Sequence, residues 1–287
     1  MLVPAPLLAV DAPSLLYRAF FALPQSITDD DGHPVNALLG TANLILFVIE
    51  RHDPRAVVLC WGAEAADYRT DAFPAYHADR PPMPPELERQ WRAAPLFFAA
   101  FGWRSESVAD LEADDLLGSL AQIEAAAGGE VLLFTGDRDM FQCVNDAVTV
   151  LFPRGGKDGP EVVDAPSVRE RYGIEPEQVP DFIALRGDPS DGLPGAKGIG
   201  AKTARDLLRA HGTLEGVIAA AWKPGAMTPR QAGALTADPD ALRAFKDIAT
   251  LRDVDLERPA DMPLDRAGAA VAARELGMNR LAERLGG

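Results

Sequence analysis

Short apolar runs alternate with helix-like segments along the first half of the chain. The runs short enough to be buried strands cover 7–10, 56–61, 103–108, 130–134 and 148–152. Between them, apolar residues recur at helical spacing over 14–23, 35–51, 86–102 and 111–127, and 140–144 suggests one further turn of helix. Such alternation is typical of a mostly parallel sheet with helices on both faces. The pattern therefore predicts an α/β core whose ligand site lies at the carboxyl ends of the strands.

The composition changes near residue 187. Glycine and proline crowd 187–200, and helical patterns follow over 201–210, 213–221, 241–251 and 267–285. We therefore expect a core over 1–180 and a helical region over 181–287. Within the core, 74–102 contains the stiff PPMPP and then a helical pattern, so we expect it to be an insertion that stands above the site. Residues 153–160 (PRGGKDGP) are expected to form a hairpin or exposed loop.

Length and composition favour a globular chain. Its 287 residues, 47% of them hydrophobic, can bury a substantial interior. No window approaches the roughly 18 apolar residues of a membrane span, and no basic segment precedes the N-terminal apolar run, so we expect a cytoplasmic protein without a membrane partner. Cys60 and Cys143 lie in apolar surroundings far apart in the sequence, which favours core packing over a disulfide.

Seven acids gather in three short clusters that follow apolar runs or open helical patterns. The clusters are EADD (Glu112, Asp114, Asp115), DRD (Asp137, Asp139) and DPSD (Asp188, Asp191), and Asp11 follows the first apolar run. Carboxylates packed this closely repel one another unless cations bind them, and oxygen ligands with room for water suit Mg²⁺ or Mn²⁺. Two such ions can hydrolyse a phosphodiester. Helical spacing places Glu112 and Asp115 on one face and Asp114 on another.

The net charge argues against a polyanionic partner. It is −15, whereas surfaces that bind nucleic acid are normally basic. Assigning eight acids to metals still leaves a net charge of −7. DNA binding would therefore depend on a local basic track and on bridging metals, and we expect it to be sensitive to salt.

A glycine-rich turn follows the last acidic cluster. In GLPGAKGIGAKTA, Gly195, Gly198 and Gly200 form a tight turn that opens a helix, with Lys202 near its start. The positive end of a helix and accessible backbone N–H groups can bind a phosphate. On its own, a glycine pattern of this kind is a weak signal.

Together these motifs resemble the bacterial 5′ to 3′ exonuclease and flap endonuclease family, which includes the N-terminal nuclease domain of DNA polymerase I. The resemblance covers nearly all of the chain and depends on LLAVDAPSLLYRAFFAL, YRTDAFPAYHADRPPMP, LEADD, TGDRDM and GDPSDGLPGAKGIGAKTA, in the family's order. It implies a PIN-like α/β nuclease with a helical arch over about 74–102. It also implies a C-terminal helical region that contains a helix-hairpin-helix-like (H3TH) DNA-binding element over about 187–211.

The resemblance also implies roles for individual residues. The family's metal-site positions correspond to Asp11, Glu112, Asp114, Asp115, Asp137, Asp139, Asp188 and Asp191. Arg80 and Arg18 correspond to basic residues that stabilise the reacting phosphate, and Tyr76 to an aromatic that stacks on a base. Positions expected to contact DNA are Arg69, His77, Gly195, Gly198, Gly200 and Lys202. A weak K⁺ site at the glycine-rich turn is implied in the same way.

The chain departs from the family at two positions. Gly62 stands where the family has an aspartate after its second strand, and the sequence leaves open whether Glu64 or Asp67 substitutes, metal preference shifts or activity falls. His77 stands where the family usually has a lysine, which would add a titratable group unless Arg80 carries the role alone.

The leading hypothesis is a metal-dependent, structure-specific 5′ nuclease that cuts branched, nicked or gapped DNA in replication and repair. With no polymerase region after Gly287, we expect a stand-alone, monomeric nuclease. One alternative is a catalytically weak DNA-binding paralogue in which Gly62 marks a degraded site, although eight other acids are retained. Another is an RNA-directed nuclease of the PIN-like group.

Overall fold

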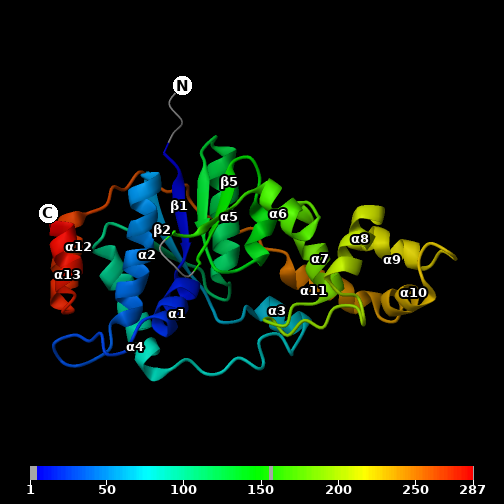
Figure 1. Cartoon of the computed structure of the whole chain (residues 1–287), viewed down its shortest axis with the longest axis horizontal. Helices are drawn as coiled ribbons and strands as arrows, with labels where there is room; N and C mark the ends of the chain where they lie inside the picture. The colour runs from blue at the N-terminus through cyan, green and yellow to red at the C-terminus, as the bar shows by residue number, and fades with distance from the viewer. Residues whose placement is uncertain (1–4, 155–157, 287) are drawn as a thin grey trace.

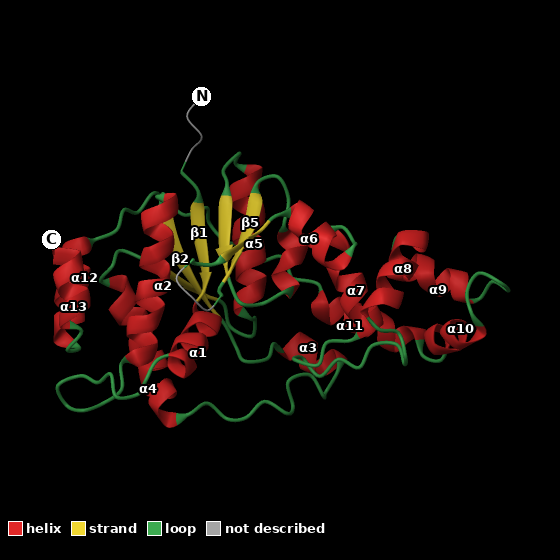
Figure 2. Ribbon diagram, viewed as in Figure 1, coloured by secondary structure: helices red, strands yellow, loops and turns green. Residues whose placement is uncertain are grey.

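A six-stranded sheet forms the centre of the molecule. The computed structural model describes residues 5–154 and 158–286. In the order β3-β2-β1-β4-β5-β6, the sheet contains β1 (Leu7–Asp11), β2 (Ala56–Trp61), β3 (Arg104–Ser107), β4 (Val131–Phe134), β5 (Val148–Phe152) and β6 (Glu161–Val163). The first five strands pair in parallel, and β6 runs antiparallel to β5 (Figure 2). The predicted mostly parallel sheet is confirmed.

Three helices cover one face of the sheet: α1 (Ala12–Ala22), α2 (Asn36–His52) and α4 (Pro85–Ala99). The C-terminal pair α12 (Arg266–Glu275) and α13 (Asn279–Gly286) packs outside them (Figure 1). Alternation along β1 assigns the faces, because Leu8 and Val10 point into this layer while Leu7 and Ala9 point into the opposite one.

The opposite face carries α5 (Ala113–Ala126) and leads into the helical region. The remaining helices are α3 (Asp67–Ala72), η1 (Asp139–Cys143), α6 (Ala165–Tyr172), η2 (Pro176–Gln178), α7 (Val179–Arg186), α8 (Ala201–His211), α9 (Leu214–Ala221), α10 (Pro229–Thr236) and α11 (Pro239–Ala249). Figure 1 shows α8, α9 and α10 at one end of the long axis and α12 and α13 at the other.

Several elements differ from the sequence prediction. The short or weakly patterned elements α3, α6, α7, α10 and β6 were not predicted. The single helix expected over 267–285 is two helices, because Gly277 adopts φ +68°, which ends α12. Part of the expected hairpin over 153–160, residues 155–157, lies outside the described residues.

The insertion expected above the site consists of a connection and a helix, and the helix packs in the core. Its helix α4 buries Leu87, Ala94, Phe97 and Phe98 in the core beside α2, so it belongs to the helical layer. Residues 73–84 form the connection that crosses from α3 to α4 (Figure 1). The insertion expected over 74–102 therefore combines this connection with a helix whose apolar face is buried in the core.

The apolar residues singled out in the sequence mostly pack as expected. Cys60 is buried, Cys143 is partly buried, and both are free thiols. Trp222 is different, because 66% of it is exposed. Within the described residues, no helix combines the length and apolar character needed to cross a membrane.

Candidate metal and DNA site

A cavity of about 410 Å³ opens at the carboxyl ends of β1, β2 and β4. Parallel strands bring segments distant in sequence to this edge of the sheet. The predicted acids that line the cavity are Asp11, Glu112, Asp114, Asp137, Asp139 and Asp191. Arg80, Arg69, Tyr76 and His77 line it as well.

Asp11 connects the sheet to the first helix. It is the last residue of β1 and the N-cap of α1, where its Oδ1 accepts a hydrogen bond from the Ser14 backbone N–H at 2.9 Å. Its Oδ2 accepts from the Thr135 hydroxyl at 2.6 Å. Burial raises the pKa of Asp11, the nearby Glu112 adds to this, and these hydrogen bonds oppose it. The carboxylate is therefore held rigidly at the cavity wall.

Asp114, Asp137 and Asp139 form the electrostatic centre of the cavity. Burial and the neighbouring carboxylates raise the pKa values of Asp114 and Asp139 well above the usual range. Burial also raises the pKa of Asp137 to about 6, with Asp191 and Asp11 adding to the shift and the Asp139 backbone N–H opposing it. Each carboxylate therefore destabilises the ionised form of the others.

This donor set fits hard divalent cations. All of the donors are carboxylate oxygens, and a cation would relieve the repulsion that raises their pKa values. Among the described residues, no three His, Cys, Asp or Glu side chains form a ready-made group around one metal position.

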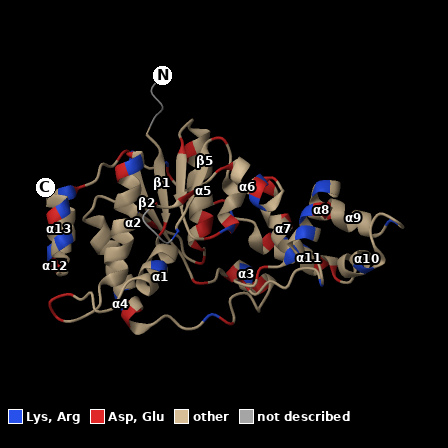
Figure 3. Cartoon of the chain, in the orientation of Figure 1, with Lys and Arg blue, Asp and Glu red and all other residues tan. Residues whose placement is uncertain are grey.

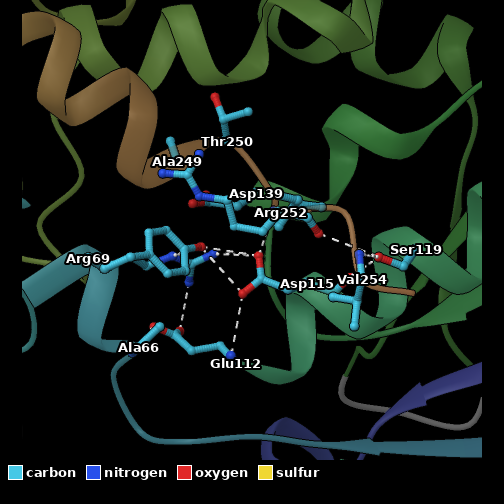
Figure 4. A network of polar contacts seen from close by, with 12 residues as sticks. Ala66, Arg69, Glu112, Asp115, Ser119, Asp139, Ala249, Thr250, Arg252 and Val254 are labelled. Carbon is cyan, nitrogen blue, oxygen red and sulfur yellow. Dashed lines mark hydrogen bonds and ion pairs between the residues drawn. The ribbon is translucent and has the colours of Figure 1, made fainter. Parts of the chain in front are cut away.

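Asp115 lies outside the cavity, whereas Asp114 lines it. The carboxylate of Asp115 is fully buried and bonded to Tyr68, Arg69 and the backbone N–H of Arg252 (Figure 4). Helical spacing had grouped Asp115 with Glu112 and separated Asp114. That grouping is misleading here because Glu112 is the N-cap of α5 and has extended, not helical, backbone angles.

Two further predicted residues do not line the cavity. Asp188 lies close enough to raise the pKa values of Asp137 and Asp139, but its oxygens accept bonds from Ser190 and Arg186. Arg18 is partly buried on α1, one residue beyond the cavity-lining Tyr17. The geometry therefore favours Tyr17 over Arg18 as the residue of this pair that faces a substrate.

Asp191 is held by two residues of the 73–84 connection. The Nε2 of His77 lies 3.0 Å from Asp191 Oδ1, and the His77 Nδ1 lies 2.8 Å from the backbone oxygen of Glu64. Arg80 Nη2 lies 3.7 Å from the same Asp191 oxygen, and the Arg80 side chain is 48% exposed. Arg80 can therefore face a substrate phosphate, whereas only 5% of the His77 side chain is exposed, which disfavours the expected direct DNA contact.

Arg69 and Tyr76 are packed more tightly than predicted. Arg69 is 4% exposed, and its guanidinium contacts Glu112, Asp115 and the hydroxyls of two tyrosines. Tyr76 is also 4% exposed and stacks on the His77 ring at 3.8 Å between centroids. These contacts disfavour both an Arg69 contact to DNA and base stacking on Tyr76.

An aromatic group at the cavity mouth was missed as a site feature. Tyr17 and Trp91 line the cavity and contact each other edge to face at 6.1 Å between centroids. The adjacent Phe21 is 71% exposed. The signal was present in the sequence, because Tyr17 and Phe21 are four residues apart on a helix that starts at an acid.

Gly62 leaves no room for the carboxylate that the family resemblance implies at this position. A Cβ at this position would lie 2.3 Å from the Ala113 backbone nitrogen and 2.5 Å from the Glu112 carbonyl carbon. The end of β2 therefore packs directly against the start of α5. Of the two acids considered as substitutes, Glu64 lines the cavity and Asp67 does not.

The glycine-rich turn has the predicted tight geometry. Gly195 and Gly198 have φ +64° and +78°, and Gly200 is the N-cap of α8. A Cβ on Gly195 would lie 2.2 Å from the Gly187 nitrogen, so only glycine fits. Lys202 is exposed in the first turn of α8, and Figure 3 shows further blue segments on α8 and α10.

Comparisons with known proteins agree with this architecture. Residues 6–173 match the model of the 5′-3′ exonuclease N-terminal resolvase-like domain, and residues 174–269 match that of the 5′-3′ exonuclease C-terminal SAM fold. A 5′-3′ exonuclease of Streptomyces coelicolor is 36% identical over 96% of this chain and 97% of its own length. A thermostable DNA polymerase I of Thermus thermophilus is 42% identical over 74% of this chain. The match spans about a quarter of that polymerase's length.

Solved structures share the fold at low sequence identity. The T5 D15 protein co-crystallised with metal ions has a TM-score of 0.69 and 16% identity, and 97% of each chain is covered. The catalytic core of Rad2 in complex with DNA substrate has a TM-score of 0.67 and 14% identity, with 99% of this chain and 91% of that chain covered.

Proposed function

The chain belongs to the 5′-3′ exonuclease family, and from that premise we propose that it is a metal-dependent, structure-specific 5′ nuclease. It acts as 5′-3′ exonuclease and flap endonuclease on branched, nicked or gapped DNA in replication and repair. The observation that carries the proposal is the convergence of six carboxylates from separate elements in one cavity beside Arg80. We expect it to act as a monomer in the cytoplasm.

In this proposal the metal ligands are the six acids that line the cavity: Asp11, Glu112, Asp114, Asp137, Asp139 and Asp191. Asp188 and Asp115 support them without facing the cavity. Bound Mg²⁺ or Mn²⁺ would supply a hydroxide nucleophile and stabilise the leaving oxygen. The T5 D15 protein, which shares this fold, was co-crystallised with metal ions, and this supports metal binding here.

The protein's own residues then position the substrate. Thr135 and the Ser14 backbone hold Asp11, and His77 holds Asp191, so these carboxylates do not reorganise when a phosphate enters. Arg80, half exposed beside Asp191, stabilises the negative charge that builds up on the phosphate. Tyr17, with Trp91 against its edge, offers an aromatic surface for an unpaired base, a role first considered for Tyr76.

The helical region binds duplex DNA away from the cavity. Gly195, Gly198 and Gly200 allow a phosphate to approach the first turn of α8, where Lys202 adds charge. In this proposal residues 1–180 form the nuclease core and residues 181–287 form the DNA-binding region. The DNA-binding region contains the H3TH-like element over about 187–211, with a K⁺ site at its turn. The Rad2 complexes with DNA substrate support this use of the fold.

Cleavage of a 5′-end-labelled flap DNA, in Mg²⁺ and Mn²⁺ separately, tests the proposal. The expected result is cutting near the flap junction that disappears in an Asp137→Ala/Asp139→Ala variant. Tight flap binding in Ca²⁺ without cutting in either metal would instead support the DNA-binding paralogue, for which Gly62 is the structural argument. Preferential cutting of a matched RNA flap would support the RNA-directed nuclease.

A further inference from the structure

We propose that Asp115 is a positioning residue that acts on the cavity through Arg69 and Glu112, and that it is not a metal ligand. The inference rests on the proposed metal site and refines it. Two contacts carry it, Asp115 to Arg69 and Arg69 to Glu112 (Figure 4). Glu112 in turn lines the cavity.

The carboxylate of Asp115 is fully occupied by protein donors. Its Oδ1 accepts from the Tyr68 hydroxyl at 3.1 Å, from Arg69 Nη2 at 3.5 Å and from the Arg252 backbone N–H at 2.8 Å. Its Oδ2 accepts from the Glu112 backbone N–H at 3.4 Å. The side chain is completely buried and outside the cavity lining, so a metal ion in the cavity has no access to it.

Arg69 transmits this constraint to Glu112. Its Nη1 lies 2.7 Å from Glu112 Oε2, while its Nη2 faces Asp115 and its Nε donates to the Tyr68 hydroxyl. A planar guanidinium bonded on three sides cannot rotate without breaking several charged contacts. Asp115 therefore determines the orientation from which Arg69 holds Glu112.

Glu112 is left with limited bonding capacity for the cavity. Its Oε2 accepts from Arg69 and from the Tyr76 hydroxyl at 3.2 Å, and its Oε1 accepts from the Ala66 backbone N–H at 2.8 Å. The Glu112 side chain also faces the Asp115 backbone N–H in a capping box, so little acceptor capacity remains for a cation or its water. A small rotation of Glu112 would misdirect that remaining capacity.

Asp115 also fastens the segment that follows α11. The Arg252 N–H bonds to Asp115, and the Val254 N–H donates to the Ser119 hydroxyl at 2.8 Å, one turn further along α5. Ser119 thus anchors the same segment, and its hydroxyl donates to the Asp115 backbone oxygen at 2.8 Å, not to the Asp115 carboxylate. It provides a control that loosens the segment while the contact between the Asp115 carboxylate and Arg69 stays in place.

A double-mutant cycle between Asp115→Asn and Glu112→Gln tests the inference. Mn²⁺ affinity is measured by titration calorimetry and flap cleavage by single-turnover rates. Asp115→Asn alone should lower the cleavage rate by about 10- to 100-fold, as for residues that orient metal ligands. When Glu112→Gln is already present, adding Asp115→Asn should lower the cleavage rate by less than roughly threefold. The reason is that Asp115 acts on the cavity through Glu112. Asp114→Asn, which removes a cavity carboxylate, should weaken Mn²⁺ binding more than Asp115→Asn.

Two results would overturn the inference. Equal fold-losses from Asp115→Asn in both backgrounds would mean that Asp115 acts independently of Glu112, as a direct ligand would. Equal losses from Ser119→Ala and Asp115→Asn, measured well below both melting temperatures, would mean a general structural role. Absence of Mn²⁺ binding and cleavage in the unmutated chain would instead contradict the proposed function.

Discussion

Replacing Gly62 by aspartate should damage this protein instead of restoring the family's usual acid. A Cβ at position 62 would lie 2.3 Å from the Ala113 nitrogen and 2.6 Å from the Glu112 Cα, both backbone atoms that side-chain rotation cannot move. The substitution must therefore push β2 and the start of α5 apart. Because Glu112 and Asp114 lie at that start, the displacement also disturbs the cavity.

The expected cost follows from the overpacking of a rigid interior contact. Overpacking typically costs about 1–3 kcal/mol, and contact with the rigid backbone of Glu112 and Ala113 places Gly62→Asp near the upper end, at about 3 kcal/mol. For a chain of this size that corresponds to a fall in Tm of roughly 6 to 12 °C. Gly62→Ala should show most of the same loss, because the Cβ alone produces the clash.

Thermal unfolding followed by circular dichroism, together with flap cleavage in Mg²⁺, measures both consequences. Gly233→Ala in α10 is the matched control, since a Cβ there meets no atom within 4 Å. We expect the control to gain up to about 1 kcal/mol from helix propensity. If Gly62→Asp had the same Tm as the unmutated protein and cleaved flap DNA faster, the steric argument for Gly62 would be wrong.

Three further outcomes are expected. Glu124→Gln should destabilise the fold by about 3 kcal/mol in urea unfolding at neutral pH, because it removes the buried carboxylate that pairs with Arg55 and Arg258 and leaves Arg55 only the exposed Asp261. Burial alone would raise the pKa of Glu124, but hydrogen bonds from these arginines outweigh it and lower the pKa, so this stabilisation is lost as pH falls through the lowered value. Calorimetric Mn²⁺ affinity should weaken below about pH 6, because protons compete for Asp137. The same raised pKa makes the metal-free protein more stable as pH falls through that value. Gly195→Ala should disrupt the glycine-rich turn and weaken flap binding in Ca²⁺, whereas Gly200→Ala, where a Cβ meets nothing within 4 Å, should leave stability within about 0.5 kcal/mol.

Each outcome has a result that would contradict it. Equal urea midpoints for Glu124→Gln and the unmutated protein would show that the arginines find other partners. Mn²⁺ affinity independent of pH between 5 and 7 would be inconsistent with a protonated Asp137 in that range. Normal flap binding by Gly195→Ala would show that the turn does not form the proposed phosphate contact.

The sheet and its acidic edge were predictable because they depend on local pattern. Apolar runs of strand length, separated by helical spacing, indicate parallel strands, and parallel strands bring their carboxyl ends together. Asp11, Asp137 and Asp139 follow such runs, and they reach the cavity as expected. Elements with weak sequence patterns, such as α3 and α7, were not predicted. Such helices are stabilised mainly by tertiary contacts, which a local sequence pattern does not show.

The roles of individual charged residues were much less predictable. An arginine such as Arg69 is a common DNA contact, and an aspartate such as Asp115 is a common metal ligand. In this fold the two residues instead bury their charges against each other. Tyr76 and Tyr17 are both aromatic residues near acids, but the fold packs the first and leaves the second at the cavity mouth. Nothing in local spacing separates these cases.

The family, the α/β architecture and the set of acids available for metal binding could be read from the amino-acid sequence, because those properties follow from hydrophobic periodicity and from motif order. Which of these acids face the cavity depends on the folded arrangement. A carboxylate's direction depends on partners from distant segments: Arg252 on Asp115, Thr135 on Asp11 and His77 on Asp191. The same holds for Gly62, whose lack of a side chain is explained by the backbone of α5 pressing against it.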